Sequence, residues 1–353
     1  MLLPKEGAPW HALCSVNEMI KKRLINGDSA DINPLLPIQY KWAWEHFING
    51  CANNWFPHEI PMGDDTTLWK SDQLSADERL LLLRNFGFFS AAETLVANNL
   101  SLAVYKFITA GECRQYILRQ AYEEAIHAHS FLYICESLSL DPTEVFHMYQ
   151  QIPVIRAKEA FQNQLVSEML NPEFTTDTFS GAQRFLENLI GFYVILEGIF
   201  FYGGFAMVLA FRRQNKMKGV CQMYEFILRD ETIHLNFGID LINGIKEENP
   251  ALWTSDLQVR VLQRIEEAVV LEARFTEECL PRGIFGLNPT LFHRYIEYIA
   301  DRRLERIGMP MRYHSDNPLI WMSEEMDLYK EKNFFETTVT EYRPASSLQW
   351  NKD

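Results

Sequence analysis

The sequence predicts an all-α fold, in which a bundle of long helices packs around one large core. Three observations support this. Apolar residues recur at helical spacing over several long segments, the connections between those segments are short, and no long stretch alternates apolar and polar residues as a strand would. With 353 residues and 47% hydrophobic content, the chain can fill a core of this kind.

The helices are expected in chain order after an irregular N-terminal arm. The arm, about residues 1–70, is dense in proline and tryptophan, as in a segment that wraps over a domain surface with short helical pieces. Ser75 and Glu78 then form a capping box, and an apolar helix follows from Leu80 to Phe107. Further helices are predicted over about 112–138, 143–170, 180–213, 217–246, 254–279 and 289–306.

The C-terminal residues differ in composition from the rest of the chain. Residues 331–353 are polar and sparse in core residues, so we expect them to be a flexible tail, disordered in the free protein. The sequence therefore predicts one domain over residues 1–330, which includes the N-terminal arm, followed by this tail.

Composition excludes several classes of protein. The formal net charge is -14, with 47 acidic and 33 basic residues, and no Lys/Arg cluster forms a phosphate-binding face, so we expect no nucleic-acid partner. The 6 cysteines include no Cys-x-x-Cys pair, which fits a reducing cytoplasm. The N-terminus lacks the basic and apolar regions of a signal peptide. A cytoplasmic location is expected.

The most apolar stretch, residues 189–211, contains one charged residue, Glu197. A membrane span with a charge at its midpoint and no partner span is disfavoured, so we expect no membrane insertion. In a helix, every face near Glu197 is apolar, and no rotation brings its carboxylate to water. A buried carboxylate must bind a proton, pair with a cation or ligate a metal, and for a lone glutamate the first two are commoner.

Two Glu-x-x-His motifs favour the third possibility. Glu124 and His127 lie in one predicted helix, and Glu231 and His234 lie in another. Residues three apart in a helix project from nearly the same face, about 4.5 Å apart along the axis, so each motif offers a carboxylate beside an imidazole. A single motif of this kind is a frequent accident on a helix surface. Its repetition makes the pattern more specific.

Each motif is preceded, roughly 30 residues earlier, by a glutamate in apolar surroundings, Glu93 before the first and Glu197 before the second. The order Glu, Glu-x-x-His, Glu, Glu-x-x-His is that of dinuclear carboxylate bundles. The predicted metal ligands are Glu93, Glu124, His127, Glu197, Glu231 and His234. Hard oxygen donors with two imidazoles suit iron or manganese, four carboxylates offset the charge of two such ions, and open coordination positions would let O2 react.

These motifs resemble those of the radical-generating small subunit of class I ribonucleotide reductase. The resemblance runs from about Trp55 into the tail. Its motifs are Glu124-Ala-Ile-His127, Glu197 followed by Phe201 and Phe205, and Arg229-Asp-Glu-Thr-Ile-His-Leu-Asn-Phe237. It implies a ferritin-like bundle, the same six ligands, a homodimer, and transfer of a one-electron equivalent to a large subunit that reduces ribonucleotides to deoxyribonucleotides.

The sequence departs from the commonest family pattern at Phe131. Most members carry there the tyrosine that stores the radical, and a phenylalanine has no phenolic O–H to lose. Phe131 together with Glu93, where many members have aspartate, resembles the subclass that uses a manganese/iron pair, in which a high-valent manganese beside iron(III) holds the oxidising equivalent. Two iron ions remain the alternative, because sequence does not select manganese over iron.

The resemblance also assigns a transfer route. Trp55 is similar to the tryptophan near the surface, Asp230 to the carboxylate that links it to His127, and Tyr342 to the tail tyrosine that passes the radical on. Each has a plainer interpretation: Trp55 as packing for the arm, Asp230 as an orienter of an imidazole, and Tyr342 as an incidental tail residue. Leu348 and Trp350 are expected to anchor the tail on the large subunit. Phe201, Phe205 and Ile227 are expected to form an apolar pocket by the metals. His129, two residues after His127, points away from it around the helix and is not expected to be a ligand.

Two other functions are compatible with a dinuclear site in a helical bundle. One is a stand-alone oxidase that acts on a bound lipid-like molecule without a partner subunit. Such a protein would have little use for Trp55 or for Tyr342 in a flexible tail. The other is an iron store of the ferritin type, which the long arm and tail disfavour.

Overall fold

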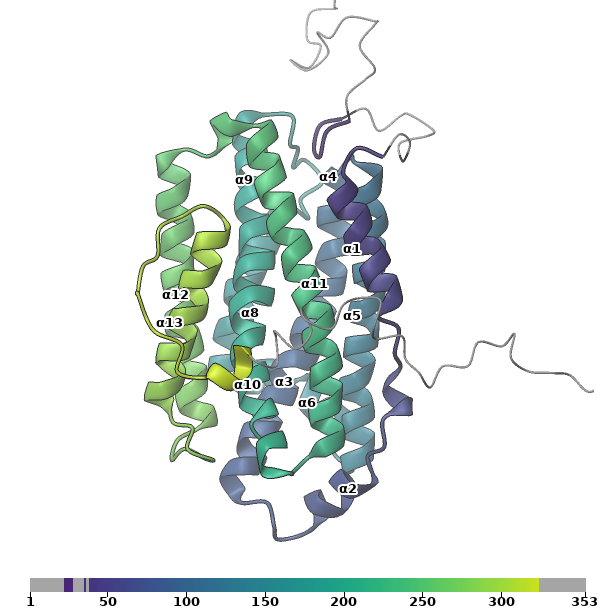
Figure 1. Ribbon diagram of the computed structural model, residues 1–353, viewed down its shortest axis with the longest axis vertical. Coiled ribbons are helices and arrows are strands. Elements are labelled where there is room, and N and C mark those ends of the chain that lie inside the picture. The colour runs from purple at the N-terminus through teal and green to yellow at the C-terminus, as the bar shows by residue number, and fades with distance from the viewer. Residues whose placement is uncertain (1–21, 28–34, 36–37, 324–353) are drawn as a thin grey trace, which may run out of the picture. The chain divides into compact units, whose positions relative to one another are not determined.

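A computed structural model describes residues 22–27, 35 and 38–323 (Figure 1). The chain divides into two compact units, Met1–Pro318 and Leu319–Asp353, and the fold below is that of the first. Across the described residues, all regular structure is helical, and the only β-type pairings are two isolated bridges. The predicted all-α class is therefore confirmed. The predicted tail over 331–353 lies outside the described residues.

Long helices form the body of the first unit, and several of them run side by side in Figure 1. The longest are α3 (Ala76–Asn99), α5 (Gly111–Leu138), α8 (Pro153–Ser167), α11 (Lys218–Glu248), α12 (Ser255–Cys279) and α13 (Pro289–Arg306). Shorter elements in the arm are α1 (Lys41–Ala52), η1 (Pro57–Glu59) and α2 (Gly63–Lys70). The remaining short elements are η2 (Leu100–Val104), α4 (Tyr105–Phe107), α6 (Pro142–Phe146), α7 (Met148–Gln151), η4 (Arg212–Gln214) and η5 (Pro250–Leu252).

The predicted start of α3 is confirmed by its cap. The Ser75 hydroxyl accepts a hydrogen bond from the Glu78 N–H at 3.2 Å, and the Glu78 carboxylate accepts one from the Ser75 N–H at 2.6 Å. These two bonds satisfy backbone donors that have no partner within the helix. The helical path then continues to Phe107, as predicted, through the π-helical turn η2.

The prediction of one helix over 143–170 is wrong. The structure divides this segment into α6, α7 and α8, and the last helix ends at Ser167. Proline has no N–H to donate and disfavours helical geometry in the residue before it. Ile152, which precedes Pro153, accordingly has φ -99° and ψ 113°, and Pro153 becomes the first residue of α8.

The apolar stretch with Glu197 lies in a helix that changes type along its length. It begins as α9 (Phe179–Leu189), becomes the π-helical segment η3 (Ile190–Phe200), and continues as α10 (Phe201–Leu209). Every residue of η3 and α10 is buried. A Cβ on Gly204 would lie 2.4 Å from the Phe89 ring of α3, so glycine permits this close packing.

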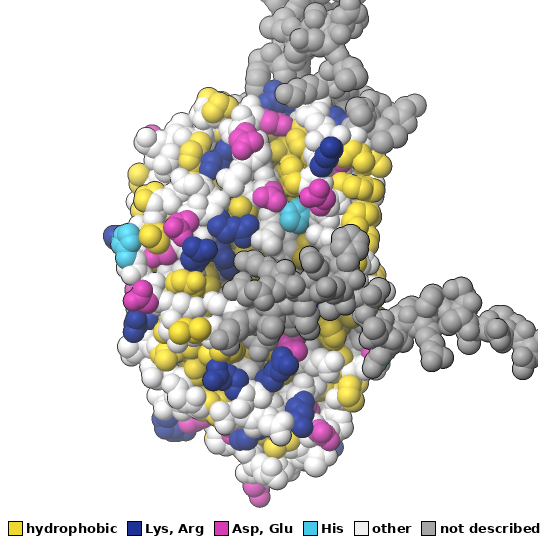
Figure 2. Space-filling view, viewed as in Figure 1, with side chains coloured by type: hydrophobic (Ala, Val, Ile, Leu, Met, Phe, Trp, Pro, Cys, Tyr) yellow, Lys and Arg dark blue, Asp and Glu magenta, His cyan; other side chains and the backbone are white. Residues whose placement is uncertain are grey.

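Within the part of the chain that the structure describes, two helical segments are long and apolar enough to cross a membrane, Ala76–Phe107 and Phe179–Gln214. All of the most apolar 18-residue window in the second is buried inside the protein, as the core helix of a bundle requires. On the face shown in Figure 2, Lys and Arg are interspersed with Asp and Glu and form no continuous basic surface.

Candidate metal centre

Four helical elements bring the six predicted ligands to one place in the core. Glu93 comes from α3, the first Glu-x-x-His motif from α5, Glu197 from η3, and the second motif from α11. Each of these side chains is completely buried, including the carboxylate that the sequence places in the apolar stretch. The six residues are Glu93, Glu124, His127, Glu197, Glu231 and His234.

The cluster contains two overlapping groups of four residues, each with one potential ligand atom per residue and all four atoms within 4.8 Å of one another. Glu124 and Glu231 belong to both groups, so each can place one oxygen toward each of two ions. The first group adds Glu93 and His127, and the second adds Glu197 and His234. This is the division expected when two carboxylates bridge a dinuclear centre.

The two imidazoles direct the same ring nitrogen into the cluster. His127 Nδ1 lies 3.1 Å from a Glu231 oxygen and 3.3 Å from a Glu124 oxygen. His234 Nδ1 lies 3.1 Å from the other Glu124 oxygen and 3.4 Å from the other Glu231 oxygen. The Glu-x-x-His spacing explains this geometry, because it puts each imidazole beside the carboxylate one turn earlier.

The outward nitrogens meet two further acids. His127 Nε2 lies 3.2 Å from Asp230, and His234 Nε2 lies 2.8 Å from Glu123. A carboxylate at Nε2 favours the tautomer that carries its proton there, which leaves the Nδ1 lone pair free to bind a metal. Arg119 donates to the other oxygen of Glu123 at 2.9 Å, so this acid is itself held in place.

Many polar atoms that face the cluster have no hydrogen-bond partner among the described residues. They are both oxygens of Glu93 and of Glu231, one oxygen each of Glu124 and Glu197, and Nδ1 of both histidines. Buried polar atoms without partners are costly, and several converging on one point need an explanation. Two divalent cations would satisfy these oxygen and nitrogen donors, so the residues present fit a dinuclear metal centre.

The ionisation of the cluster reflects its burial and its surplus of acids. Burial raises the pKa of Glu93 and of Glu197 well above the usual value, and neighbouring carboxylates add to both shifts. Burial alone would lower the pKa of His127, but the four carboxylates around it, that of Asp230 foremost, raise it instead. Burial opposes ionisation of Glu124, yet the two imidazoles outweigh it and lower its pKa. A positive metal charge replaces the bound protons in such a site.

Two residues that contact the ligands, Glu123 and Gln120, are not indicated by the sequence motifs. Glu123 is adjacent to a predicted ligand, and an acid in a helix does not by itself indicate burial. Gln120 lies one turn before Glu124, and its amide donates to Glu197 at 2.8 Å while its oxygen accepts from the Tyr193 hydroxyl at 3.1 Å. The position of Gln120, one helical turn before a predicted ligand, could have indicated from the sequence that it faces the metal site. The contact with Tyr193 depends on packing that the sequence does not specify.

The residues of the predicted transfer route that the structure describes lie together. Trp55 donates its indole N–H to Asp230 Oδ2 at 2.8 Å, the same oxygen that faces His127. The Trp55 and His127 rings are stacked with centroids 6.3 Å apart, and the Asn53 amide donates to the other oxygen of Asp230. Tyr342, with the predicted anchors Leu348 and Trp350, lies outside the described residues.

Phe131 is fully buried in an aromatic group beside the cluster. Its ring stacks on Phe89 at 5.6 Å and meets Tyr224 edge-on at 5.8 Å. The Phe201 and Phe205 rings each pack on Phe89, with centroids 5.0 and 5.1 Å from it, so they belong to this aromatic group. Ile227 is likewise fully buried. The Tyr224 hydroxyl is buried without a partner among the described residues.

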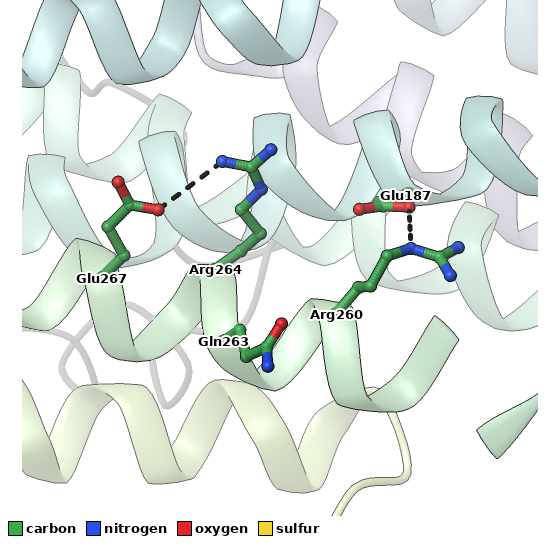
Figure 3. Close-up of a pocket in the computed structure, with 5 residues that line it drawn as sticks. All are labelled: Glu187, Arg260, Gln263, Arg264 and Glu267. Atoms are coloured by element: carbon green, nitrogen blue, oxygen red, sulfur yellow. Dashed lines mark hydrogen bonds and ion pairs between the residues drawn. The ribbon is translucent and has the colours of Figure 1, made fainter. Parts of the chain in front are cut away.

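Other candidate groups lie outside the cluster. His129 stacks on His58 at 5.0 Å and belongs to neither group of potential ligands. Figure 3 shows a surface depression between α9 and α12, where Arg260 pairs with Glu187 at 3.0 Å and Arg264 pairs with Glu267 at 3.5 Å. Each arginine there has a carboxylate partner, so the depression presents no uncompensated positive charge to an anion.

Comparisons with known proteins agree with this geometry. The sequence model of the family "Ribonucleotide reductase, small chain" matches residues 32–318. The protein is 60% identical over 333 residues to the ribonucleoside-diphosphate reductase subunit beta of Chlamydia pneumoniae, covering 94% of this chain and 96% of that one. It is 29% identical over 333 residues to the ribonucleoside-diphosphate reductase small chain of Nicotiana tabacum, covering 94% of each.

The fold agrees as well. It matches the ribonucleotide reductase R2 subunit from Clostridium botulinum with a TM-score of 0.79 and 26% sequence identity, covering 86% of this chain and 94% of that one. The ferritin-like bundle predicted from the resemblance is thereby confirmed. By sequence and by structure, the chain thus belongs to the ribonucleotide reductase small-chain family.

Proposed function

We propose that this chain is the radical-generating small subunit of a ribonucleoside-diphosphate reductase and that its six-residue cluster holds a manganese/iron pair. Such a pair, when bound, reacts with O2 and stores one oxidising equivalent that a separate large subunit uses to reduce ribonucleotides to deoxyribonucleotides. The chain's own residues hold the ions in a dry interior, exclude water and reductants, and provide a route for one electron between the centre and the protein surface.

One observation carries this proposal, namely the two overlapping groups of buried ligand atoms that share Glu124 and Glu231. Hard carboxylate oxygens with one imidazole per ion suit iron and manganese, and no thiolate is among the ligands. All six side chains are fully buried, which limits access of water to the ions. Oxygen and nitrogen atoms of these ligands have no hydrogen-bond partner among the described residues, and bound metal ions would satisfy them.

The choice of manganese with iron rests on Phe131. Its ring lies against Phe89 and Tyr224 in a fully buried apolar pocket, at the position where most family members carry a radical-storing tyrosine. A benzene ring has no O–H to give up, so the oxidising equivalent has to remain on the ions. Glu93, rather than aspartate, at the first ligand position supports the same subclass. Two iron ions are the alternative occupant of this ligand set.

For the transfer route, we assign the first steps at the centre to His127, Asp230 and Trp55. Asp230 Oδ2 accepts from the Trp55 indole at 2.8 Å and faces His127 Nε2 at 3.2 Å, which gives a continuous hydrogen-bonded path. Trp55 is only 8% exposed, so a further redox residue must connect it to the partner subunit. We assign that connection to Tyr342 of the tail.

We further propose that the protein works in the cytoplasm as a homodimer and binds the large subunit through residues 331–353, with Leu348 and Trp350 as apolar anchors. The apolar helical segment Ala76–Phe107 supports the dimer, because only 61% of its most apolar window is buried within one chain. Leu102 and, on α5, Leu118 remain exposed, and a second copy would cover such side chains.

The test compares the full chain with a variant truncated after residue 334, both loaded with manganese and iron in the presence of O2. We expect equal metal uptake in the two proteins, because the six ligands all precede the truncation. Turnover with the large subunit should fall to background in the truncated protein. Unchanged catalytic activity after truncation would instead favour a stand-alone oxidase, and failure of the full chain to bind either metal would refute the proposed centre.

A further inference from the structure

A buried arginine lies directly behind the ligand that is carried by the π-helical segment. Arg303 of α13 is 7% exposed, and its Nε donates to the main-chain carbonyl of Gly198 at 2.9 Å. Gly198 immediately follows Glu197. The guanidinium also lies over the Tyr202 ring, with its central carbon 4.5 Å from the ring centroid. One side chain from a distant helix thus contacts the backbone next to a ligand and the turn after it.

Stability does not account for this arginine. A buried guanidinium has lost its hydration, and replacing buried ionic groups by apolar ones of similar volume is often neutral or stabilising. Among the described residues, no carboxylate forms an ion pair with Arg303, and burial lowers the pKa of its guanidinium. Its Nη2 has no hydrogen-bond partner among the described residues. The cost of burying the guanidinium points to a role at the groups it contacts, the Gly198 carbonyl and the Tyr202 ring.

The sequence of η3 accommodates that contact. A Cβ on residue 198 would lie 3.2 Å from the Arg303 Nε and 3.1 Å from the Tyr193 carbonyl oxygen, closer than ordinary packing allows. Glycine therefore makes room for the guanidinium. π-helical backbone is rare and occurs frequently at functional sites, and an external donor at one of its carbonyls helps to hold it. In η3, the held residue is the one next to Glu197.

A second contact links the same arginine to the other ligand helix. The hydroxyl of Tyr202, on whose ring Arg303 lies, contacts the Thr232 hydroxyl at 3.0 Å. Thr232 adjoins Glu231, and its hydroxyl also donates to the Leu228 carbonyl at 2.7 Å. Arg303 is therefore connected to the backbone beside Glu197 and, through Tyr202, to the turn that carries Glu231, which belongs to both groups of potential ligands.

We propose that Arg303 is a positioning residue that fixes the π-helical turn carrying Glu197 and thereby sets the metal affinity of the group formed by Glu124, Glu197, Glu231 and His234. The inference rests on the proposed dinuclear centre and adds an asymmetry to it. Arg303 contacts the backbone beside a ligand unique to this group, whereas no contact of Arg303 reaches Glu93 or His127 among the described residues. The two ions should therefore respond differently to its removal.

The test uses the full chain, stripped of metal and titrated with Mn²⁺ alone, with free Mn²⁺ followed by electron paramagnetic resonance. The wild-type protein should bind two ions. Arg303→Met should bind one ion as the wild type does and the other at least tenfold more weakly. Diffraction at the manganese absorption edge should show the lost occupancy in the group that contains Glu197. Thermal unfolding of the stripped protein should be unchanged or shifted upward in this variant.

Two variants serve as controls. Arg303→Lys keeps a buried cation that can donate to the Gly198 carbonyl, so we expect its weaker site to lie within about threefold of wild type, although lysine lacks the planar fork. Lys246→Met removes a similar contact elsewhere, because Lys246 donates to the Ile307 carbonyl at 2.5 Å and lies 4.2 Å from the Trp253 ring centroid. It should leave both Mn²⁺ sites unchanged.

The outcomes separate this inference from the proposed function. Two unchanged Mn²⁺ affinities in Arg303→Met overturn the positioning role and leave the dinuclear centre intact. An equal loss at both sites overturns it too, because the effect is then not directed through Glu197. If Arg303→Met does not fold, a tenfold loss of affinity at both sites in Arg303→Lys likewise overturns the positioning role. Absence of Mn²⁺ binding by the wild type refutes the centre itself.

Discussion

The two histidines of the cluster are held by different acids, and this difference allows each ion to be perturbed separately. His127 Nε2 faces Asp230 at 3.2 Å, whereas His234 Nε2 faces Glu123 at 2.8 Å. Asp230→Asn and Glu123→Gln keep the size of each side chain and remove its charge. We predict that the asparagine variant weakens the ion beside His127 and that the glutamine variant weakens the ion beside His234.

The magnitude follows from the bond that each substitution removes. A hydrogen bond to a charged group contributes about 1.5–3 kcal/mol, so replacing the carboxylate by an amide forfeits an energy of that order. Loss of an outer partner of a metal-ligating histidine typically lowers metal affinity by about 10–100-fold. At about 1.4 kcal/mol per factor of ten, this range corresponds to roughly 1.4–2.8 kcal/mol. The two estimates agree, and we expect a loss of about 10–100-fold at one site in each variant.

The assay is a titration of the metal-stripped variants with Mn²⁺, with diffraction at the manganese edge to assign the weakened site. Each of the two variants is the control for the other, because each should keep full Mn²⁺ affinity at the site that the other weakens. A general disruption of the fold would weaken both sites. Both sites weakened equally in Asp230→Asn would contradict the proposed division into two groups. Full affinity at both sites in both variants would show that the outer acids do not orient the imidazoles.

Three further predictions concern other parts of the protein. Trp55→Phe should leave metal uptake unchanged but reduce turnover with the large subunit to background, since phenylalanine lacks the indole N–H and is far harder to oxidise. Lys158→Met should cost about 3–5 kcal/mol in urea unfolding, because it leaves Glu272, 2.6 Å from the lysine, as an unpaired buried charge, and adding Glu272→Leu should recover most of the loss. A cost below about 1 kcal/mol would contradict this interpretation of the pair. Finally, the stripped protein should become less stable as the pH rises above the usual pKa of a glutamate, about 4.3. The pKa values of Glu93 and Glu197 are raised on folding, so the stability from their bound protons is complete below about 4.3 and is lost as the pH rises through the raised values. Bound metal should reduce this pH dependence, and a stripped protein whose melting temperature is constant over the same range would contradict it.

Much of the fold followed from local sequence signals. The capping box at Ser75 set the start of α3, and the helical spacing of apolar residues gave the extents of α5, α11, α12 and α13 closely. The prediction of one helix over 143–170 is wrong because the spacing of apolar residues continues through Pro153, whereas the helical backbone is interrupted there. The π-helical geometry of η3 was also not foreseen. An apolar run gives the same pattern for either type of helix, and the choice between them depends on tertiary contacts.

The cluster was accessible from sequence because its members are acids and histidines at fixed helical spacing, in surroundings where a charge has no other partner. Its supporting residues were less accessible. Glu123 has the appearance of a surface acid until α5 and α11 are packed together, when its carboxylate meets His234. Arg303 lies 105 residues from Gly198, and no local pattern connects them. Long-range contacts of this kind are specified by the packing of the whole bundle.

The central claim is that six side chains from four helical elements hold two transition-metal ions between them. Its most direct test is diffraction from crystals of the full chain loaded with manganese and iron, recorded at the absorption edge of each element. Two anomalous peaks are predicted, one among Glu93, Glu124, His127 and Glu231 and the other among Glu124, Glu197, Glu231 and His234, with manganese in one and iron in the other. Iron in both positions would refute the manganese assignment alone, and the absence of any peak within the cluster would contradict the centre.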